Sequence, residues 1–302
     1  MFDFLARRFD SVVAPFPTSV MLPANSQQYL GLVRSVLFKC LMGMGVTIGL
    51  SLSSGLTAIA QDVPAPEPAQ SNAPPSELMM MLQQIDQAAS DEELATVMEF
   101  YSDEIQHGDG LTWDELRSML ANFWVVYDNL DYSTQLTEWE ATETGFVTTT
   151  VTEITGEHAF GSDIVRLEST LESRQQMQNG QIVEQEILAE RSQIQLGETP
   201  PTVNVRLPEA IAIGQPFFFD AIVLEPIGES LLMGTAYTDT VALDTYTRVP
   251  AIELNVLDAG GLFKQGEASL TPSQEWISGL VIREDGLTGV TQRLRVVNLT
   301  DL

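Results

Sequence analysis

The stretch RLESTLESRQQMQNGQIVEQEILAERSQIQLGE, residues 166–198, decides the fold. Before Asn179-Gly180, Val165, Leu167, Ser169 and Leu171 alternate with Arg166, Glu168, Thr170 and Glu172. A period of two is typical of a β-strand with one buried face, and Asn-Gly between two such segments is the strongest short signal for a β-hairpin. We therefore predict strands over residues 163–178 and 181–195. Because strands of about 15 residues are far longer than the usual length of roughly five or six, we expect a strongly bent sheet.

Upstream of this hairpin, the sequence predicts helices that are followed by further strands. The period is again two over residues 134–141 and 145–154, which predicts two more strands. Residues 76–124 instead show apolar side chains spaced by three and four, which predicts three successive helices. Each helix has a start signal: Ser76 for the first, Ser90 with Glu93 for the second, and Thr112 with Glu115 for the third. The apolar series of the second helix extends to Tyr101.

Downstream of the hairpin, the sequence Gly-Glu-Thr-Pro-Pro at 197–201 ends the last strand and marks a boundary. Short apolar runs then recur between turn residues, without a helical period, at 202–207, 216–224, 231–238, 251–256, 276–283 and 291–298. About six short strands over roughly 100 residues predict an all-β, sandwich-like domain. We interpret Gly260-Gly261 as a tight turn that anchors Phe263 in the core. The alternative is a close approach of the backbone to a ligand or to the neighbouring domain, which positive φ at these glycines would permit.

The first 60 residues are typical of an export signal. An apolar stretch over 40–60 follows Arg34 and Lys39 and closes with Ala58-Ile59-Ala60. This order of basic region, apolar region and small-residue site predicts a secretory signal. The alternative is an uncleaved signal anchor, because the 21 residues of this stretch are long enough to span a bilayer. With either outcome, we expect the rest of the chain to be exported, either to the periplasm or out of the cell.

The chain therefore divides into four regions. Residues 1–60 are the extension with its signal, residues 61–76 are a Pro-rich linker, residues 77–197 are a first folded domain, and residues 198–302 are a second. The linker holds five prolines, which favour a stiff, extended tether.

The composition excludes several classes of function. The chain of 302 residues has 42 acidic and 14 basic side chains, a formal net charge of -28 that would repel nucleic acid. With 44% hydrophobic residues, it has enough apolar material for one or two cores. One cysteine and two histidines argue against a Cys-cluster or multi-His metal site, and no calcium-loop, nucleotide-binding or hydrolase motif is present. We therefore predict neither a dedicated metal site nor a cofactor.

Residues 77–197 resemble a known superfamily. The resemblance rests on ELMMMLQQIDQAASDEELATVMEFYSDEI at 77–105, on LTWDELRSMLANFW at 111–124, and on the final hairpin. With these features the segment is similar to the nuclear transport factor 2-like superfamily, which includes SnoaL-like polyketide cyclases and ketosteroid isomerases. The resemblance implies a cone-shaped α+β domain, with helices packed on a strongly curved antiparallel sheet, and a homodimer formed through the sheets. We thus predict the fold class α+β, with this cone followed by the C-terminal all-β, sandwich-like domain.

Candidate site residues gather near the end of the second predicted helix. Tyr101, Asp103 and His107 are the candidate catalytic residues, since isomerases of the resembled superfamily pair a carboxylate base with a tyrosine donor. The alternative is that this segment is a helix end whose charges face water.

The candidate ligand pocket combines aromatic side chains with one arginine, namely Trp113, Trp124, Tyr127 and Arg166. Aromatic side chains with a few polar groups suit a small apolar ligand, whereas core packing is the alternative. Arg166 would receive an anionic group, with a cross-strand ion pair as its alternative.

No motif in the chain activates a nucleophile or positions a metal, so we expect an exported, non-catalytic binding or assembly module. Its partner would be a small apolar molecule or a protein, with membrane contact only through an uncleaved N-terminal segment. Two alternatives stay open. The first is an enzyme of the isomerase, hydratase or cyclase type with an acid–base pair inside the cone, and the second is a structural protein of the cell envelope.

Overall fold

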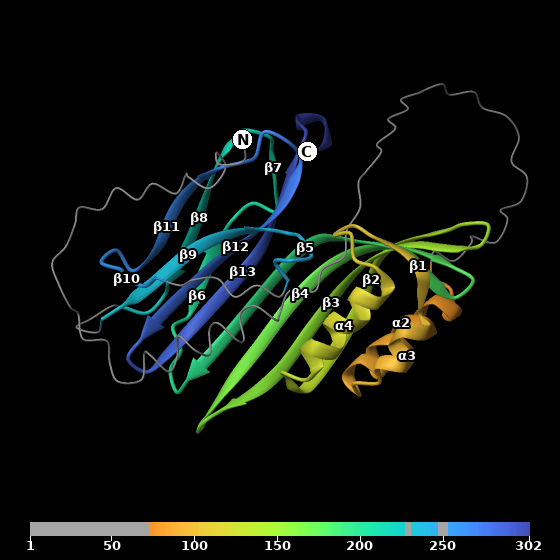
Figure 1. The fold of residues 1–302 in the computed structure, drawn as a ribbon, viewed down its shortest axis with the longest axis horizontal. Coiled ribbons are helices and arrows are strands. Elements are labelled where there is room, and N and C mark those ends of the chain that lie inside the picture. Colours follow the sequence, from red (N-terminus) through yellow and green to blue (C-terminus); the bar gives the residue numbers. More distant parts are fainter. Residues whose placement is uncertain (1–72, 227–230, 247–252) are drawn as a thin grey trace, which may run out of the picture.

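The computed structural model describes residues 73–226, 231–246 and 253–302. Of these residues, 57% lie in strands and 16% in helices. The main element is a sheet of ten strands, and a second sheet of three strands lies at one end of it (Figure 1). The predicted export signal and the linker up to residue 72 lie outside the described residues. Within those residues, no helix is long and apolar enough to cross a membrane.

The first half of the described chain contains three helices and five strands. They are α2 (Ser76–Ser90), α3 (Leu94–Glu99), β1 (Tyr101–His107), α4 (Trp113–Trp124), β2 (Asp128–Ala141), β3 (Gly145–Phe160), β4 (Asp163–Gln178) and β5 (Gln181–Gly197). The predicted long hairpin is confirmed as β4 and β5. Asn179 and Gly180 both adopt positive φ, 52° and 81°, as a tight two-residue turn requires.

The second half consists almost entirely of short strands. They are β6 (Val203–Arg206), β7 (Ala210–Ala212), β8 (Pro216–Val223), β9 (Met233–Thr240), β10 (Asn255–Val256), β11 (Gly261–Glu267), β12 (Ser273–Arg283) and β13 (Gly286–Val297), before a 3-10 turn, η2 (Leu299–Asp301). The large sheet has the order β10-β9-β12-β13-β5-β4-β3-β2, with β1 beside β5 and β7 beside β13. The small sheet has the order β11-β8-β6.

The predicted fold class, an α+β cone followed by a separate β domain, is wrong. The described chain is mostly β, and one large sheet runs through both halves, because β13 pairs antiparallel with the end of β5. The start of β5 pairs with β1 in parallel, so β1 and β13 share the edge of β5 that β4 leaves open. The physical reason is that an uncovered β5 would expose a row of unpaired backbone groups. Strand patterns locate β5 and β13, but they do not show that these strands pair.

The two faces of the large sheet carry different hydrophobic cores. On β12, Leu280 and Ile282 join the core under the helices, whereas Ile277 and Val281 join the core that faces the small sheet. Successive residues of a strand point to opposite faces, so β12 is buried on both sides. The small sheet therefore covers the face opposite to the one that the helices cover, and Figure 1 shows these two coverings at opposite ends of the sheet.

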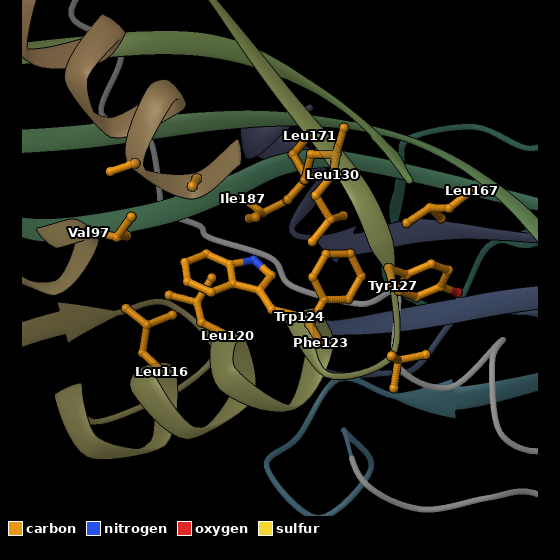
Figure 2. Packing of buried hydrophobic residues seen from close by; sticks show 14 of the residues in the cluster. Val97, Leu116, Leu120, Phe123, Trp124, Tyr127, Leu130, Leu167, Leu171 and Ile187 are labelled. Atoms are coloured by element: carbon orange, nitrogen blue, oxygen red, sulfur yellow. The ribbon is translucent and has the colours of Figure 1, made fainter. Parts of the chain in front are cut away.

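Helix α4 anchors the helical layer to the sheet. Figure 2 shows Phe123 and Trp124 pointing from α4 toward Leu171 of β4 and Ile187 of β5. All four side chains are buried, and burying a large apolar side chain stabilises a fold by about 1.5–3 kcal/mol.

Only one of the three predicted helix starts has its capping hydrogen bonds. The capping box of Thr112 and Glu115 is confirmed, with both reciprocal hydrogen bonds present. Ser76 is the first residue of α2 rather than its cap, and Ser90 belongs to α2 and accepts a hydrogen bond from the backbone N–H of Tyr132. The second predicted helix is also too long, because Tyr101 begins β1.

One strand is longer and one turn is shorter than the sequence predicted. His158 lies within β3, so that strand continues beyond its predicted end. Gly260 ends a turn with a φ of 77°, whereas Gly261 already begins β11, which pairs along its whole length with β8. In this strand Phe263 is 50% exposed, so its predicted place in the core is wrong. It points away from the core because its neighbours Leu262 and Lys264 occupy the other face of the strand.

Candidate functional site

A cavity lies between the helical layer and the inner face of the sheet. Its volume is about 90 Å³, and most of the surface that lines it belongs to apolar atoms. The apolar lining residues are Leu82, Ile85, Ala89, Val97, Leu120, Phe123, Ile154 and Leu171. A cavity of this size holds several waters or part of a small organic molecule.

The polar lining residues of the cavity come from α2 and from strands β1 to β5. They are Asp86, Tyr101, Tyr132, Thr134, Thr152, Ser173, Gln175 and Gln185. Two of them are tyrosines that each accept a hydrogen bond: Tyr101 from Gln185 Nε2 (3.4 Å) and Tyr132 from Trp124 Nε1 (3.0 Å). Burial raises the pKa of both phenols, so both stay neutral and keep a proton to donate.

Asp86 is the one carboxylic acid in the described lining of the cavity. It is half-buried, and its oxygens accept hydrogen bonds from Thr134 N (2.7 Å) and Thr134 Oγ1 (2.6 Å). Burial raises the pKa of this carboxyl above its ordinary value, although the bonds from Thr134 oppose the change. The interaction joins α2 to β2, so Asp86 holds the helix on the sheet and also presents an acid to the cavity.

The three candidate catalytic residues do not meet at the cavity. Tyr101 lines it, but Asp103 is exposed on the same strand. His107 is buried at the end of β1, where its Nδ1 accepts a hydrogen bond from the backbone N–H of Asp109 (3.2 Å). Tyr101 and His107 are separated by most of the length of β1, so they cannot act on one small substrate.

None of the four candidate pocket residues belongs to the described lining of the cavity. Trp113 donates its indole N–H to the carbonyl of Met98, and Trp124 orients the cavity residue Tyr132. Tyr127 is fully buried in the core, next to the ring of Phe123. Arg166 is exposed on β4, opposite Glu157, and its neighbours Val165 and Leu167 are the residues that face the core.

Of the cavity's eight polar residues, the sequence prediction named only Tyr101 as a candidate site residue. A signal is present for Asp86, Gln175 and Gln185 among the missed residues, because each occupies a position on the apolar face of its element. Gln175 lies between Ser173 and Met177 on the inward-facing side of β4. A polar residue at such a position indicates a buried polar site.

A buried charge cluster lies apart from the cavity and joins the two halves of the chain. Arg293 on β13 contacts Asp109, Glu190 and Gln274, while Trp276 Nε1 donates to Glu190 Oε2 (3.1 Å). These acceptors of the guanidinium are all side chains of the protein itself, so the cluster serves as an internal joint. Among the described residues, no group of three or more His, Cys, Asp or Glu could hold a metal ion.

Comparison with known proteins finds a match to a family and matches to solved structures. Residues 198–297 match a family described as a domain of unknown function, DUF8623. The match begins at the predicted domain boundary, and the division of the chain there stays a prediction. No curated protein matches the chain.

The structure of an M. tuberculosis LEH-like epoxide hydrolase, which has a nuclear transport factor 2-like fold, is similar over 37% of this chain and 81% of its own. The identity is 14% and the TM-score 0.26, values that support no conclusion about activity.

Proposed function

We propose that this protein binds a small molecule with an apolar body in the cavity between its helices and the inner face of β1 to β5. The observation that carries the proposal is the cavity's mainly apolar lining, into which a few polar groups converge. That combination is typical of small-molecule sites, because apolar contact supplies affinity and a few polar groups fix orientation. On the basis of residues 1–60, we further propose that binding takes place outside the cytoplasm.

A neutral fluorophore tests the proposal. N-phenylnaphthylamine gains fluorescence when it leaves water for an apolar site, so the full chain should bind it. Ser173→Leu places a larger side chain in the cavity lining and should weaken binding about tenfold or more. Ser133→Leu makes the same change at an exposed position of β2 and is the matched control. Equal binding by both variants and the natural protein would place the fluorophore elsewhere and contradict the proposal.

Acid–base catalysis on the bound molecule is a second candidate, and one observation favours it. Asp86 is a carboxyl group with a raised pKa at the cavity, and such groups serve as general acids or bases. Asp86 would take the role that the sequence prediction gave to Asp103 or His107. In an assay of proton exchange from a bound ketone, Asp86→Asn should abolish exchange and leave binding intact. Exchange that continues in this variant would exclude the catalytic role.

A further inference from the structure

A row of three buried polar side chains crosses the sheet at the cavity. Thr148 on β3 lies opposite Gln175 on β4, and Gln175 lies opposite Gln185 on β5. The three side chains are 1%, 8% and 0% exposed, and both glutamines line the cavity. Directly opposite residues on one face have Cβ atoms about 5 Å apart, so this polar row is continuous.

Each member of the polar row has an oxygen that lacks a hydrogen-bond partner. These atoms are Thr148 Oγ1, Gln175 Oε1 and Gln185 Oε1, which find no partner among the described residues. A buried polar atom without a partner costs about 1–3 kcal/mol, and most such atoms in proteins are satisfied. Three of them side by side, two of them on residues that line the cavity, indicate a place where a bound molecule completes the hydrogen bonding.

The polar row offers both a donor and an acceptor. With Gln185 Nε2 donating to Tyr101 Oη, the phenol proton and Gln185 Oε1 are left to bind a ligand. If the amide is turned over, the phenol donates to Oε1, and the amide N–H and a phenol lone pair are left instead. One donor and one acceptor face the cavity in both arrangements, so the complementary head group must accept and donate as well.

The charge of the lining restricts the head group further. Among the described lining residues none is Lys, Arg or His, so an anionic head would be buried without a counter-ion. The acid Asp86 lies at the other end of the cavity, since it binds Thr134, whose partner across the sheet is Thr152. Thr152 is four residues from Thr148, a separation of about 13 Å along a strand. A cationic head drawn to Asp86 would therefore leave the polar row unsatisfied.

We infer that the cavity recognises an uncharged head group that both donates and accepts hydrogen bonds, a hydroxyl or a carboxamide, which the row Thr148–Gln175–Gln185 binds while the apolar body lies against the helices. This inference rests on the proposed function and names the class of ligand. It also predicts that charged analogues with the same body bind weakly, because their heads would lose hydration without gaining a partner of opposite charge.

Four unbranched six-carbon compounds test the inference by calorimetric titration of the full chain. Hexanol and hexanamide should bind about tenfold or more tightly than hexanoate and hexylamine. Hexanoate or hexylamine binding as tightly as hexanol would overturn the inference and leave the proposed function standing. The inference is likewise overturned, and the proposed function stands, if none of the four binds while the fluorophore still binds in a manner sensitive to Ser173→Leu. If the fluorophore binding is insensitive to Ser173→Leu, the proposed function itself fails.

A variant of the polar row provides the second test of the inference. Gln185→Leu should weaken hexanamide binding about tenfold, because the head group loses its hydrogen-bond partners. Gln176→Leu, next to Gln175 but on the opposite face of β4, is the matched control and should bind hexanamide normally. Normal hexanamide binding by Gln185→Leu would overturn the assignment of the row.

Discussion

Arg293 and Asp109 form a two-point ion pair across 184 positions of the chain, with Nη1–Oδ1 at 2.9 Å and Nη2–Oδ2 at 3.0 Å. Glu190 accepts from the same guanidinium, also at 3.0 Å, and all three side chains are buried. Asp109 and Glu190 belong to the first half of the chain and Arg293 to the second. A bidentate pair has a fixed geometry, so this contact sets how the two halves meet.

Removing the shared cation should therefore destabilise the whole protein. Arg293→Met leaves Asp109 and Glu190 as two buried carboxylates without a counter-ion, and we expect the free energy of unfolding to fall by about 3–5 kcal/mol. Urea unfolding at neutral pH measures the change. Arg191→Met, at an exposed position on β5, is the control and should change stability by about 0.5 kcal/mol or less. If the free energy of unfolding falls by a similar amount in both variants, Arg293 does not hold the two halves of the chain together.

The local parts of this fold were predictable, and the pairing across its middle was not. Asn179-Gly180 and the Thr112–Glu115 box act within a few residues, so their sequence signals are complete by themselves. The pairing of β13 with β5 depends on which strand covers an open edge, and several strands of suitable pattern compete for it. The apolar run at residues 291–298 predicts a strand that contains Arg293. The residues around Arg293 do not indicate that Asp109 is its partner.

The candidate site was predictable to a similar extent. Tyr101 was selected as part of a polar cluster at a helix end, and it lines the cavity from a strand instead. Gln175 and Gln185 were not selected, although they continue the inward-facing series of β4 and β5. A bulge in β5 between Ile187 and Ala189, where the register with β4 shifts, changes the phase of the alternation. Sequence alternation alone does not locate such a shift.

The confirmed capping box should contribute measurably to stability. Thr112 accepts from Glu115 N, and Glu115 Oε2 accepts from Thr112 N (2.8 Å), so Thr112→Ala removes one half of the box. We expect a loss of about 1 kcal/mol in the free energy of unfolding. Ser76→Ala is the matched control, because the start of α2 has no side-chain capping bond and this change should have little effect. Chemical denaturation of both variants makes the comparison, and equal losses would argue against the box.

Glu186 should make the stability depend on pH. Burial raises the pKa of its carboxyl to about 7 from an ordinary 4.5, while Arg295 and Arg174 oppose the rise and Glu184 and Asp109 reinforce it. Between these values the folded protein holds a proton that the unfolded chain releases, so stability falls as the pH rises from 4.5 to about 7.

The measurement is the melting temperature of the natural protein and of Glu186→Gln across that range of pH. The variant cannot ionise at this position, so its advantage over the natural protein should grow as the pH approaches 7. Glu168→Gln, at an exposed position of β4, should run parallel to the natural protein. A constant difference between Glu186→Gln and the natural protein at every pH would refute the assignment.

The shared sheet predicts that the first half of the chain does not fold alone. A fragment of residues 73–197 would turn the end of β5 into an open edge and lose Leu280, Ile282 and Leu287 from the core under the helices. It would also lose Arg293, the cation that Asp109 and Glu190 share. Open edges promote association, and a core that loses large apolar side chains is destabilised, so we expect an aggregating or unfolded fragment. Residues 73–302 should instead unfold in one cooperative transition, and adding residues 198–302 in trans should rescue the fragment. Circular dichroism and size-exclusion chromatography decide the matter, since a monomeric fragment with a cooperative melt would show that the two halves are independent domains.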